Sequence, residues 1–283
     1  MTDQRRVMIV TDSTSDLPDI LRTRHDITVV PLTVVFGEES FRDRVDITPE
    51  TFLDRLTHAP QLPTTSQPPA HTFSAVFADA LSRDMNVVCI TISSALSGTF
   101  NAARLAAEEF GQDRIRVIDS RCATMQLGWV AVAAARAAES GADLDAVERA
   151  ALDAIPHTRL FAVLQTLDYL YKGGRIGRAQ HMVGSALGIK PVLSVIDGIV
   201  TPVERVRTWK KALAQAIDLA SGDGPLTDIA VLHAGNLPDA ERTAAALQER
   251  FPQANIVIDW AGTTILTYAG PGAIGIMTLA ADS

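Results

Sequence analysis

Residues 86–109 read NVVCITISSALSGTFNAARLAAEE and contain a strand, a turn and a helix in that order. Positions 87–92 form the short apolar run that is typical of a buried parallel strand. The turn at 93–99 is rich in hydroxyl groups, and 100–109 carries helix-forming residues with few breakers. A strand that leads through a turn into a helix is the repeating unit of a parallel sheet covered by helices, so these residues indicate an α/β fold.

The same alternation of strand and helix runs through the first half of the chain. The helix at 124–139 is apolar almost all round, so we expect it to be buried. Thr48-Pro49-Glu50 is a good helix start, because threonine caps a helix and proline suits its first position. The alternation predicts a mostly parallel sheet with helices on both faces. Its expected strands are 7–11, 27–36, 87–92 and 115–118, and its expected helices follow Pro18 and Thr48 and occupy 69–83, 100–109, 124–139 and 143–154.

Near Pro156 the pattern changes to hairpins mixed with helices. A hairpin is predicted over 190–206, because Asp197-Gly198 is a strong signal for a type I′ turn. The length of 283 residues also exceeds the usual size of a single domain. We therefore expect an α/β domain over 1–156 and an α+β domain over 157–283. Further elements expected in the second half are strands at 160–164, 229–233, 255–258 and 273–279 and helices at 208–220 and 239–251.

Composition limits the partners and the location. A net charge of -8 at pH 7 argues against nucleic acid or an anionic membrane as the main partner. The most apolar helix segment, 127–135, falls short of the about 18 residues that span a bilayer, so we expect no stable membrane insertion. Cys89 and Cys122 lack metal or redox spacing, and the N-terminus lacks the apolar region of a signal peptide. We expect a cytoplasmic protein with reduced thiols.

A candidate anion site lies in the turn at 93–99. Its hydroxyls, Ser97 and Thr99 among them, gather where a helix begins and where backbone N–H groups point outward unpaired. Gly98 permits close approach of a ligand to the backbone. No Lys or Arg lies at 85–100, so the turn suits a carboxylate in a dry, uncharged pocket. The alternative is an ordinary helix cap, for which Ser and Thr are preferred.

A second candidate is the loop at 62–69, LPTTSQPP, whose prolines fix φ and stiffen the chain. Thr65 and Ser66 would therefore be held in place rather than merely solvated. The alternative is a routine loop that leads into the helix at 69–83, with Ser66 or Gln67 near the cap.

Catalytic motifs are few. Asp12 follows a strand, as in phosphatases with an aspartyl nucleophile. Such enzymes need a second carboxylate two residues later, and this chain has Thr14 at that position. The simpler interpretation is that Asp12 bonds nearby backbone and that Ser15 or Asp16 caps the next helix. Ser97 lacks the Gly-x-Ser-x-Gly elbow, and no paired histidine spacing predicts a metal site. A hydrolase or phosphatase that uses Ser97 or Asp12 stays an alternative function, as does a ligand-free regulatory interaction module.

Three arginines are candidates for a docking surface. Arg175 lies in a glycine-rich turn at 171–178 that lacks the ending of a P-loop, and Arg205 and Arg207 end the 190–206 hairpin. Arginine forks suit phosphate or carboxylate groups on a partner. The alternative is a set of exposed charges without a role.

Taken together, six segments resemble the DegV family of bacterial fatty-acid-binding proteins. Their order and spacing make the resemblance specific, and it covers 7–281 as a single DegV-type unit. The segments are Thr11-Asp12-Ser13-Thr14-Ser15-Asp16-Leu17, Thr65-Ser66-Gln67-Pro68, Ser94-Ala95-Leu96-Ser97-Gly98-Thr99, Gly173-Gly174-Arg175, Lys190-Pro191 and Gly270-Pro271-Gly272.

The resemblance implies two α/β domains that enclose one long-chain fatty acid, with the acyl chain in a buried apolar tunnel and the carboxylate near their junction. It implies that Thr65 and Ser97 hold the carboxylate, with Ser66, Gly98 and Thr99 as further candidates. The bound fatty acid would be presented to a separate ATP-dependent fatty-acid kinase, which makes the acyl phosphate. The protein itself would be a monomeric lipid-binding subunit in phospholipid metabolism, without cofactor or metal, rather than an enzyme.

One position departs from the family pattern. The family commonly has a histidine two residues before Gly-Pro-Gly, where this chain has Tyr268. A phenol can hydrogen-bond a carboxylate but does not titrate near neutral pH. We therefore count Tyr268 among the candidate carboxylate-binding residues, with packing as a large apolar side chain as the alternative.

Overall fold

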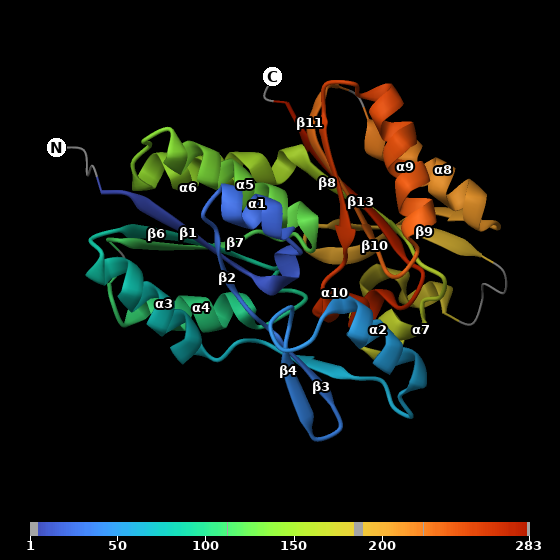
Figure 1. The fold of residues 1–283 in the computed structure, drawn as a ribbon, viewed down its shortest axis with the longest axis horizontal. Coiled ribbons are helices and arrows are strands. Elements are labelled where there is room, and N and C mark those ends of the chain that lie inside the picture. Colours follow the sequence, from blue (N-terminus) through green and yellow to red (C-terminus); the bar gives the residue numbers. More distant parts are fainter. Residues whose placement is uncertain (1–4, 112, 184–188, 223, 282–283) are drawn as a thin grey trace.

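The described residues form two large β-sheets, a small three-stranded sheet and three layers of helices (Figure 1). The computed structural model describes residues 5–111, 113–183, 189–222 and 224–281. The first sheet is parallel throughout, as predicted, and has the strand order β2-β1-β6-β7. Its strands are β1 (Val7–Asp12), β2 (Thr28–Val30), β6 (Asn86–Thr91) and β7 (Ile115–Asp119).

The second sheet is mixed and has the order β10-β9-β8-β13-β11-β12. Strands β11 and β12 pair in parallel, and the other neighbours are antiparallel. The predicted hairpin is present, and its turn residues Asp197 and Gly198 have the positive φ angles, 54° and 79°, that a type I′ turn requires. The strands are β8 (Thr158–Val163), β9 (Lys190–Ile196), β10 (Ile199–Val206), β11 (Leu226–His233), β12 (Asn255–Trp260) and β13 (Ile274–Ala280).

The core side chains define the helix layers. Because side chains alternate along a strand, Val7 and Ile9 of β1 face one layer of helices while Met8 and Val10 face another. Helices α3 (Ala70–Ser82) and α4 (Thr99–Glu108) cover the outer face of the first sheet. Between the sheets lie α1 (Asp19–Arg24), α5 (Met125–Glu139) and α6 (Leu144–Ala154), and α8 (Trp209–Ser221) and α9 (Leu237–Arg250) cover the second sheet.

Helix α5 is apolar all round because it lies between the two sheets (Figure 1). Residues 125–132 are buried without a break over two turns, which confirms the predicted burial. The indole N–H of Trp129 donates to the carbonyl oxygen of Met277 at 3.1 Å and so links α5 to the second sheet. One continuous core therefore joins the two sheets.

The strand predicted at 27–36 is wrong as a single element, because it is two strands in two sheets. Pro31 has no N–H to continue the ladder, so the chain leaves the first sheet after Val30. It then forms β3 (Thr33–Phe36), which pairs antiparallel with β4 (Glu39–Arg42) and with β5 (Thr64–Ser66). The stiffened loop predicted at 62–69 thus contributes a short strand.

Two short helices, α7 (Asp168–Lys172) and α10 (Thr263–Ala269), have no counterpart in the sequence prediction. Each is too short to display a helical periodicity. Helix α2 (Pro49–His58) begins after Thr48 as predicted, and the Thr48 hydroxyl accepts the N–H of Thr51 at 3.3 Å. The predicted domain boundary near residue 156 falls between α6 and β8 and stays a prediction.

Candidate functional site

An apolar pocket of about 320 Å³ lies beyond the carboxyl ends of β1 and β6 and reaches the second sheet. Ligands of parallel α/β sheets gather at this edge. The aliphatic wall consists of Leu32, Ile92, Leu96, Ala123, Leu160, Ala162, Leu164, Leu170, Leu193, Val195, Val200, Ile265 and Ala269. The remaining lining residues are Thr14, Thr65, Ser66, Gln67, Ser97, Gly98, Thr124, Arg175, Ser194, Thr264 and Tyr268.

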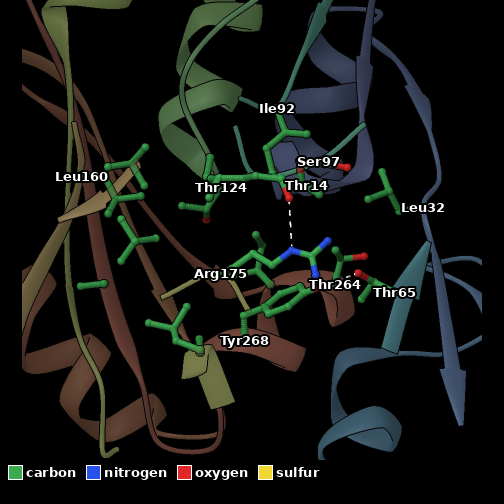
Figure 2. A pocket seen from close by; sticks show the side chains of 18 of the residues that line it. Thr14, Leu32, Thr65, Ile92, Ser97, Thr124, Leu160, Arg175, Thr264 and Tyr268 are labelled. Carbon is green, nitrogen blue, oxygen red and sulfur yellow. Dashed lines mark hydrogen bonds between the residues drawn. The ribbon is translucent and has the colours of Figure 1, made fainter. Parts of the chain in front are cut away.

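Three hydroxyl-bearing residues, Thr65, Ser97 and Tyr268, gather at one end of the pocket, which we call the mouth (Figure 2). Thr65 Oγ1 and Tyr268 Oη share a hydrogen bond of 2.6 Å. Ser97 Oγ and Thr99 Oγ1 share another of 2.9 Å. Thr99 is fully buried and does not line the pocket, so of the predicted hydroxyls it is the one that lies behind the mouth.

Two loops approach each other closely at the mouth. Thr65 pairs with Val34 of β3, so a sheet fixes its backbone. Gly98 is the N-cap of α4, and a Cβ there would lie 1.9 Å from Oε1 of Gln67. A larger residue would push Gln67 away, which is a physical reason for glycine at this position. The structure thus brings five predicted residues to one pocket: Thr65, Ser66, Ser97, Gly98 and Tyr268.

The glycine-rich turn holds the ring of Tyr268. A Cβ on Gly173 would lie 2.6 Å from the Tyr268 ring, so glycine permits this contact. The guanidinium of Arg175 lies 5.3 Å from the ring centre, which is within cation–π range. These contacts orient the phenol oxygen toward Thr65.

Arg175 lines the pocket, which corrects the expectation of an uncharged site. Its Nε donates to the carbonyl oxygen of Leu96 at 3.3 Å, and its Nη1 donates to that of Gly173 at 2.9 Å. The turn at 93–99 contains no Lys or Arg, but the fold places the guanidinium of Arg175, from the glycine-rich turn, beside it. A guanidinium is therefore available to an anion at the mouth.

The other two predicted docking residues lie away from the pocket. Arg205 and Arg207 are exposed at the end of β10 and do not line it. The guanidinium of Arg205 contacts the ring of His181. The three arginines therefore do not share one site within the pocket, and their docking role stays a prediction.

A second cavity of about 50 Å³ continues the pocket into the second sheet, and we call it the inner chamber. It reaches Met277 of β13 and His233 at the end of β11. Burial lowers the pKa of His233, so its imidazole is neutral at neutral pH. The two cavities share the wall residues Thr124, Leu160, Ala162, Leu164, Ile265 and Ala269.

Neither candidate nucleophile both lines the pocket and has a catalytic base beside it in the described part of the chain. Asp12 is fully buried and does not line the pocket. Its carboxylate accepts the N–H of Ile92 at 2.8 Å and that of Thr14 at 3.0 Å, and burial raises its pKa to about 6. Ser97 is bonded to Thr99 and to no histidine in the described part of the chain. This geometry gives the hydrolase and phosphatase alternatives no support.

Metal-binding groups and membrane-spanning helices can be assessed for residues 5–281 apart from the gaps at 112, 184–188 and 223. Within these residues, no three His, Cys, Asp or Glu side chains form a group that could hold a metal ion. Within the same ranges, no helix is both long and apolar enough to cross a membrane.

Thr14, Thr124 and Thr264 line the pocket although the sequence did not single them out as binding residues. Thr14 lies in the segment after the first strand, and Thr124 begins a predicted helix. The local sequence around each fits an ordinary helix cap as well as a binding residue. Thr264 lies in α10, for which the sequence shows no pattern.

Two sheets around an apolar pocket with a polar mouth define an α/β protein of the kind that encloses a small ligand. The chain belongs to the DegV family, because a family model described as an uncharacterised protein of the DegV family matches residues 6–281. A DegV domain-containing protein of Mycobacterium tuberculosis is 41% identical over 276 residues, which cover 95% of this chain and 96% of the relative. Protein DegV of Bacillus subtilis is 31% identical over 274 residues, or 95% and 98% of the two chains.

Solved structures share the fold. A fatty-acid-binding DegV family protein from Thermus thermophilus matches with a TM-score of 0.88 and 33% identity, over 98% of this chain and 100% of that one. DegV of Bacillus subtilis, described as a fatty acid binding protein, matches with a TM-score of 0.88 and 30% identity over the same shares. A stearic-acid-binding protein from Eubacterium ventriosum matches with a TM-score of 0.86 and 27% identity, over 97% and 98% of the two chains. These likenesses confirm the predicted family and α/β fold.

Proposed function

We propose that this protein binds a long-chain fatty acid, with the acyl chain in the apolar pocket and the carboxylate at the mouth. The observation that carries the proposal is the asymmetry of the pocket. Most of its wall is aliphatic, while Thr65, Ser97, Tyr268 and Arg175 meet at one end. Fatty-acid binding by three relatives of 27–33% identity supports the same assignment.

The acyl chain supplies most of the affinity. Burial of roughly 14 methylenes at about 0.8 kcal/mol each gives a gross gain near 11 kcal/mol. The costs of association and of ordering the chain reduce this gain. The hydroxyls and Arg175 at the mouth therefore need only fix the orientation of the head group.

We further propose that the bound carboxylate is the substrate of a separate ATP-dependent fatty-acid kinase. A carboxylate oxygen would attack the γ-phosphorus of ATP, an O–P bond would form, and ADP would leave. Arg175 supports this role, because it is exposed and also lines the mouth. An arginine fork suits both a carboxylate and a phosphate.

We also propose that the protein acts in the cytoplasm as a monomer. Cys89 and Cys122 are buried free thiols, and burial raises the pKa of both above the ordinary value for cysteine. Such thiols are poorly reactive, which suits a structural role in a reducing compartment.

Native mass spectrometry of the freshly purified protein tests the proposed function. We expect a mass increase that equals one fatty acid and disappears on denaturation. A chain that carries no lipid and takes up no added fatty acid would contradict the proposal. Turnover of generic esters or phosphates by the purified protein would support the enzyme alternative instead.

Removal of either mouth hydroxyl should weaken fatty-acid binding while the fold stays intact. Thr65→Ala and Ser97→Ala each delete a hydrogen bond to a charged group, which costs about 1.5–3 kcal/mol. Displacement of a fluorescent fatty acid measures the change. Ser82→Ala is a matched control, because the Ser82 hydroxyl donates to a carbonyl on the exposed face of α3. Wild-type affinity in both mouth variants would remove these hydroxyls from the site.

Charge removal at Arg205 and Arg207 should slow acyl-phosphate formation and spare fatty-acid binding. The double variant to glutamine removes one exposed cation at the end of β10 and one just after it. Steering by surface charge changes association rates by about tenfold or more. The rate is measured with the cognate kinase at limiting concentrations of the lipid-loaded protein. A wild-type rate would mean that the partner docks elsewhere.

A further inference from the structure

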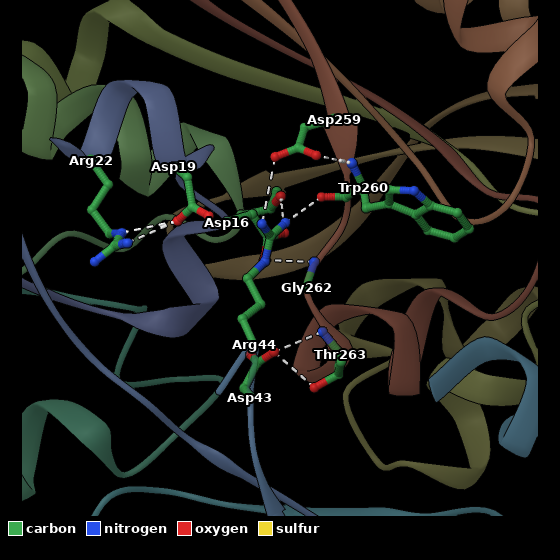
Figure 3. A network of polar contacts seen from close by, with 10 residues as sticks. Asp16, Asp19, Arg22, Asp43, Arg44, Asp259, Trp260, Gly262 and Thr263 are labelled. Carbon is green, nitrogen blue, oxygen red and sulfur yellow. Dashed lines mark hydrogen bonds and ion pairs between the residues drawn. The ribbon is translucent and has the colours of Figure 1, made fainter. Parts of the chain in front are cut away.

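Three buried carboxylates, Asp12, Asp16 and Asp43, lie behind the pocket, with exposed fractions of 0%, 0% and 1%. Each one binds a segment that lines the pocket. Asp12 holds Thr14 and the backbone of Ile92, as described above. Asp16 and Asp43 instead reach across the fold to the start of α10 (Figure 3).

Asp16 joins the end of β12 to α5. Its Oδ1 accepts the N–H of Gly262 at 3.0 Å, and its Oδ2 accepts the hydroxyl of Thr124 at 2.7 Å. A Cβ on residue 262 would lie 2.5 Å from that Oδ1, so glycine allows the close approach. Arg44 lies beside this contact, donates to the carbonyl oxygen of Trp260 and pairs with Asp259 at 3.5 Å. Asp16 is therefore part of a structural junction. The prediction that Ser15 or Asp16 caps α1 is wrong, because the N-cap residue is Pro18 and no side chain of the described residues caps this helix.

Asp43 takes the place of a helix cap for α10. Gly262 is the N-cap residue and has no side chain to accept the first N–H groups of the helix. Asp43 Oδ1 accepts the N–H of Thr263 at 2.8 Å and its hydroxyl at 2.7 Å. Oδ2 accepts the Ser13 hydroxyl at 2.9 Å and the N–H of Thr264 at 3.4 Å. A carboxylate from 220 residues earlier in the chain thus fixes the first turn.

Helix α10 connects its anchored first turn to the mouth of the pocket. Thr264 and Tyr268 are four residues apart, so both lie on the face that lines the pocket. Tyr268 meets Thr65 at 2.6 Å, and a helix shift of about 1 Å would break a hydrogen bond of that length. The position of the Tyr268 hydroxyl therefore depends on the anchoring of the first turn.

We propose that Asp43 is a positioning residue for the fatty-acid head group, which acts by anchoring α10 so that Tyr268 reaches the carboxylate beside Thr65. The inference rests on the proposed function. It assigns Asp43 a role that differs from general stabilisation of the fold. In a purely stabilising role, loss of Asp43 would lower affinity independently of Tyr268.

A double-mutant cycle of Asp43→Asn and Tyr268→Phe separates the two roles. Asparagine keeps the size of the side chain and one acceptor oxygen. Its NH2 group replaces Oδ2 and cannot accept the hydrogen bonds that Oδ2 accepts from Ser13 and Thr264. We expect each single variant to raise the Kd for a fluorescent fatty acid about tenfold and the double variant to raise it no further. Multiplied effects near a hundredfold, or wild-type affinity in Asp43→Asn, would overturn the inference.

A second pair of variants keeps the test decisive if Asp43→Asn fails to fold. Thr263→Val removes one hydrogen bond to Asp43, and Thr263→Ser restores the hydroxyl. We expect weaker binding in the valine variant, no further loss on adding Tyr268→Phe, and wild-type affinity in the serine variant. Thr267→Val is the control on the same helix, because that hydroxyl donates to the carbonyl of Thr263 and lies outside the pocket. Equal losses in the Thr263 and Thr267 valine variants would overturn the inference.

Fatty-acid binding by the wild-type protein tests the proposed function independently of the role of Asp43. If the wild-type chain binds no fatty acid, the proposed function fails. If it binds fatty acid and the cycle shows independent effects, only the role of Asp43 fails.

Discussion

Ala162→Phe should change this protein from a binder of long fatty acids into a binder of short ones. Ala162 lies on β8 and lines both the pocket and the inner chamber, so a phenyl ring there would close the passage between them. A long acyl chain would lose access to the inner chamber. A short chain that ends before the passage would keep its contacts.

The expected loss is large for the long acid. Exclusion of about four methylenes at about 0.8 kcal/mol each costs roughly 3 kcal/mol, which is a factor of about a hundred in Kd. Displacement titrations with octadecanoic and dodecanoic acid measure the two affinities. Ala162→Val is the graded control and should give a smaller shift in the same direction. An equal loss for both acids would show that the substitution acts at the mouth, and no loss would exclude the inner chamber from the binding site.

The predictable part of this fold rests on local patterns. The run at 87–92, the hydroxyl turn after it and the Asp197-Gly198 hairpin each carry their signal within a few neighbouring residues. Buried strands, helix starts and tight turns are specified by such local chemistry. Ser97 and Gly98 could therefore be named as candidates from the sequence alone.

The missing part rests on contacts between distant segments. Strand β5 has three residues and exists because it pairs with β3, so Thr65 looked like a loop residue. Helix α10 is short, and Asp43 caps it from 220 residues away. Arg175 reaches the mouth through the contact between its turn and Tyr268. No periodicity or local motif encodes pairings of this kind, which depend on the completed fold.

The protonation of Asp16 should make the stability of the fold depend on pH. Burial in the apolar interior raises the pKa of Asp16 from 3.8 to about 7, and the negative charge of Asp43 acts in the same direction. Arg44, the Thr124 hydroxyl and the N–H of Gly262 lower the pKa by a smaller amount. The folded state therefore binds the proton more tightly than the unfolded state does.

The sign of the pH dependence follows from this difference. Between pH 4 and pH 7 the folded chain holds the Asp16 proton while the unfolded chain has lost it, so the free energy of unfolding falls as the pH rises. The contribution is fully present below pH 4 and is lost by about pH 7. A difference of about 3 pKa units corresponds to roughly 4 kcal/mol.

Asp16→Asn isolates this contribution because asparagine does not ionise. The stability difference, wild type minus Asp16→Asn, should decrease by roughly 4 kcal/mol between pH 4 and pH 8, measured by urea denaturation at each pH. The contributions of Asp12 and His233 are common to both proteins and cancel. Asp46→Asn is the control, because the hydrogen bond from Arg42 lowers the pKa of Asp46 to about 2. The stability difference, wild type minus Asp46→Asn, should therefore stay nearly constant between pH 4 and pH 8. A difference that rises with pH for Asp16→Asn would mean that Arg44 keeps Asp16 ionised in the folded protein.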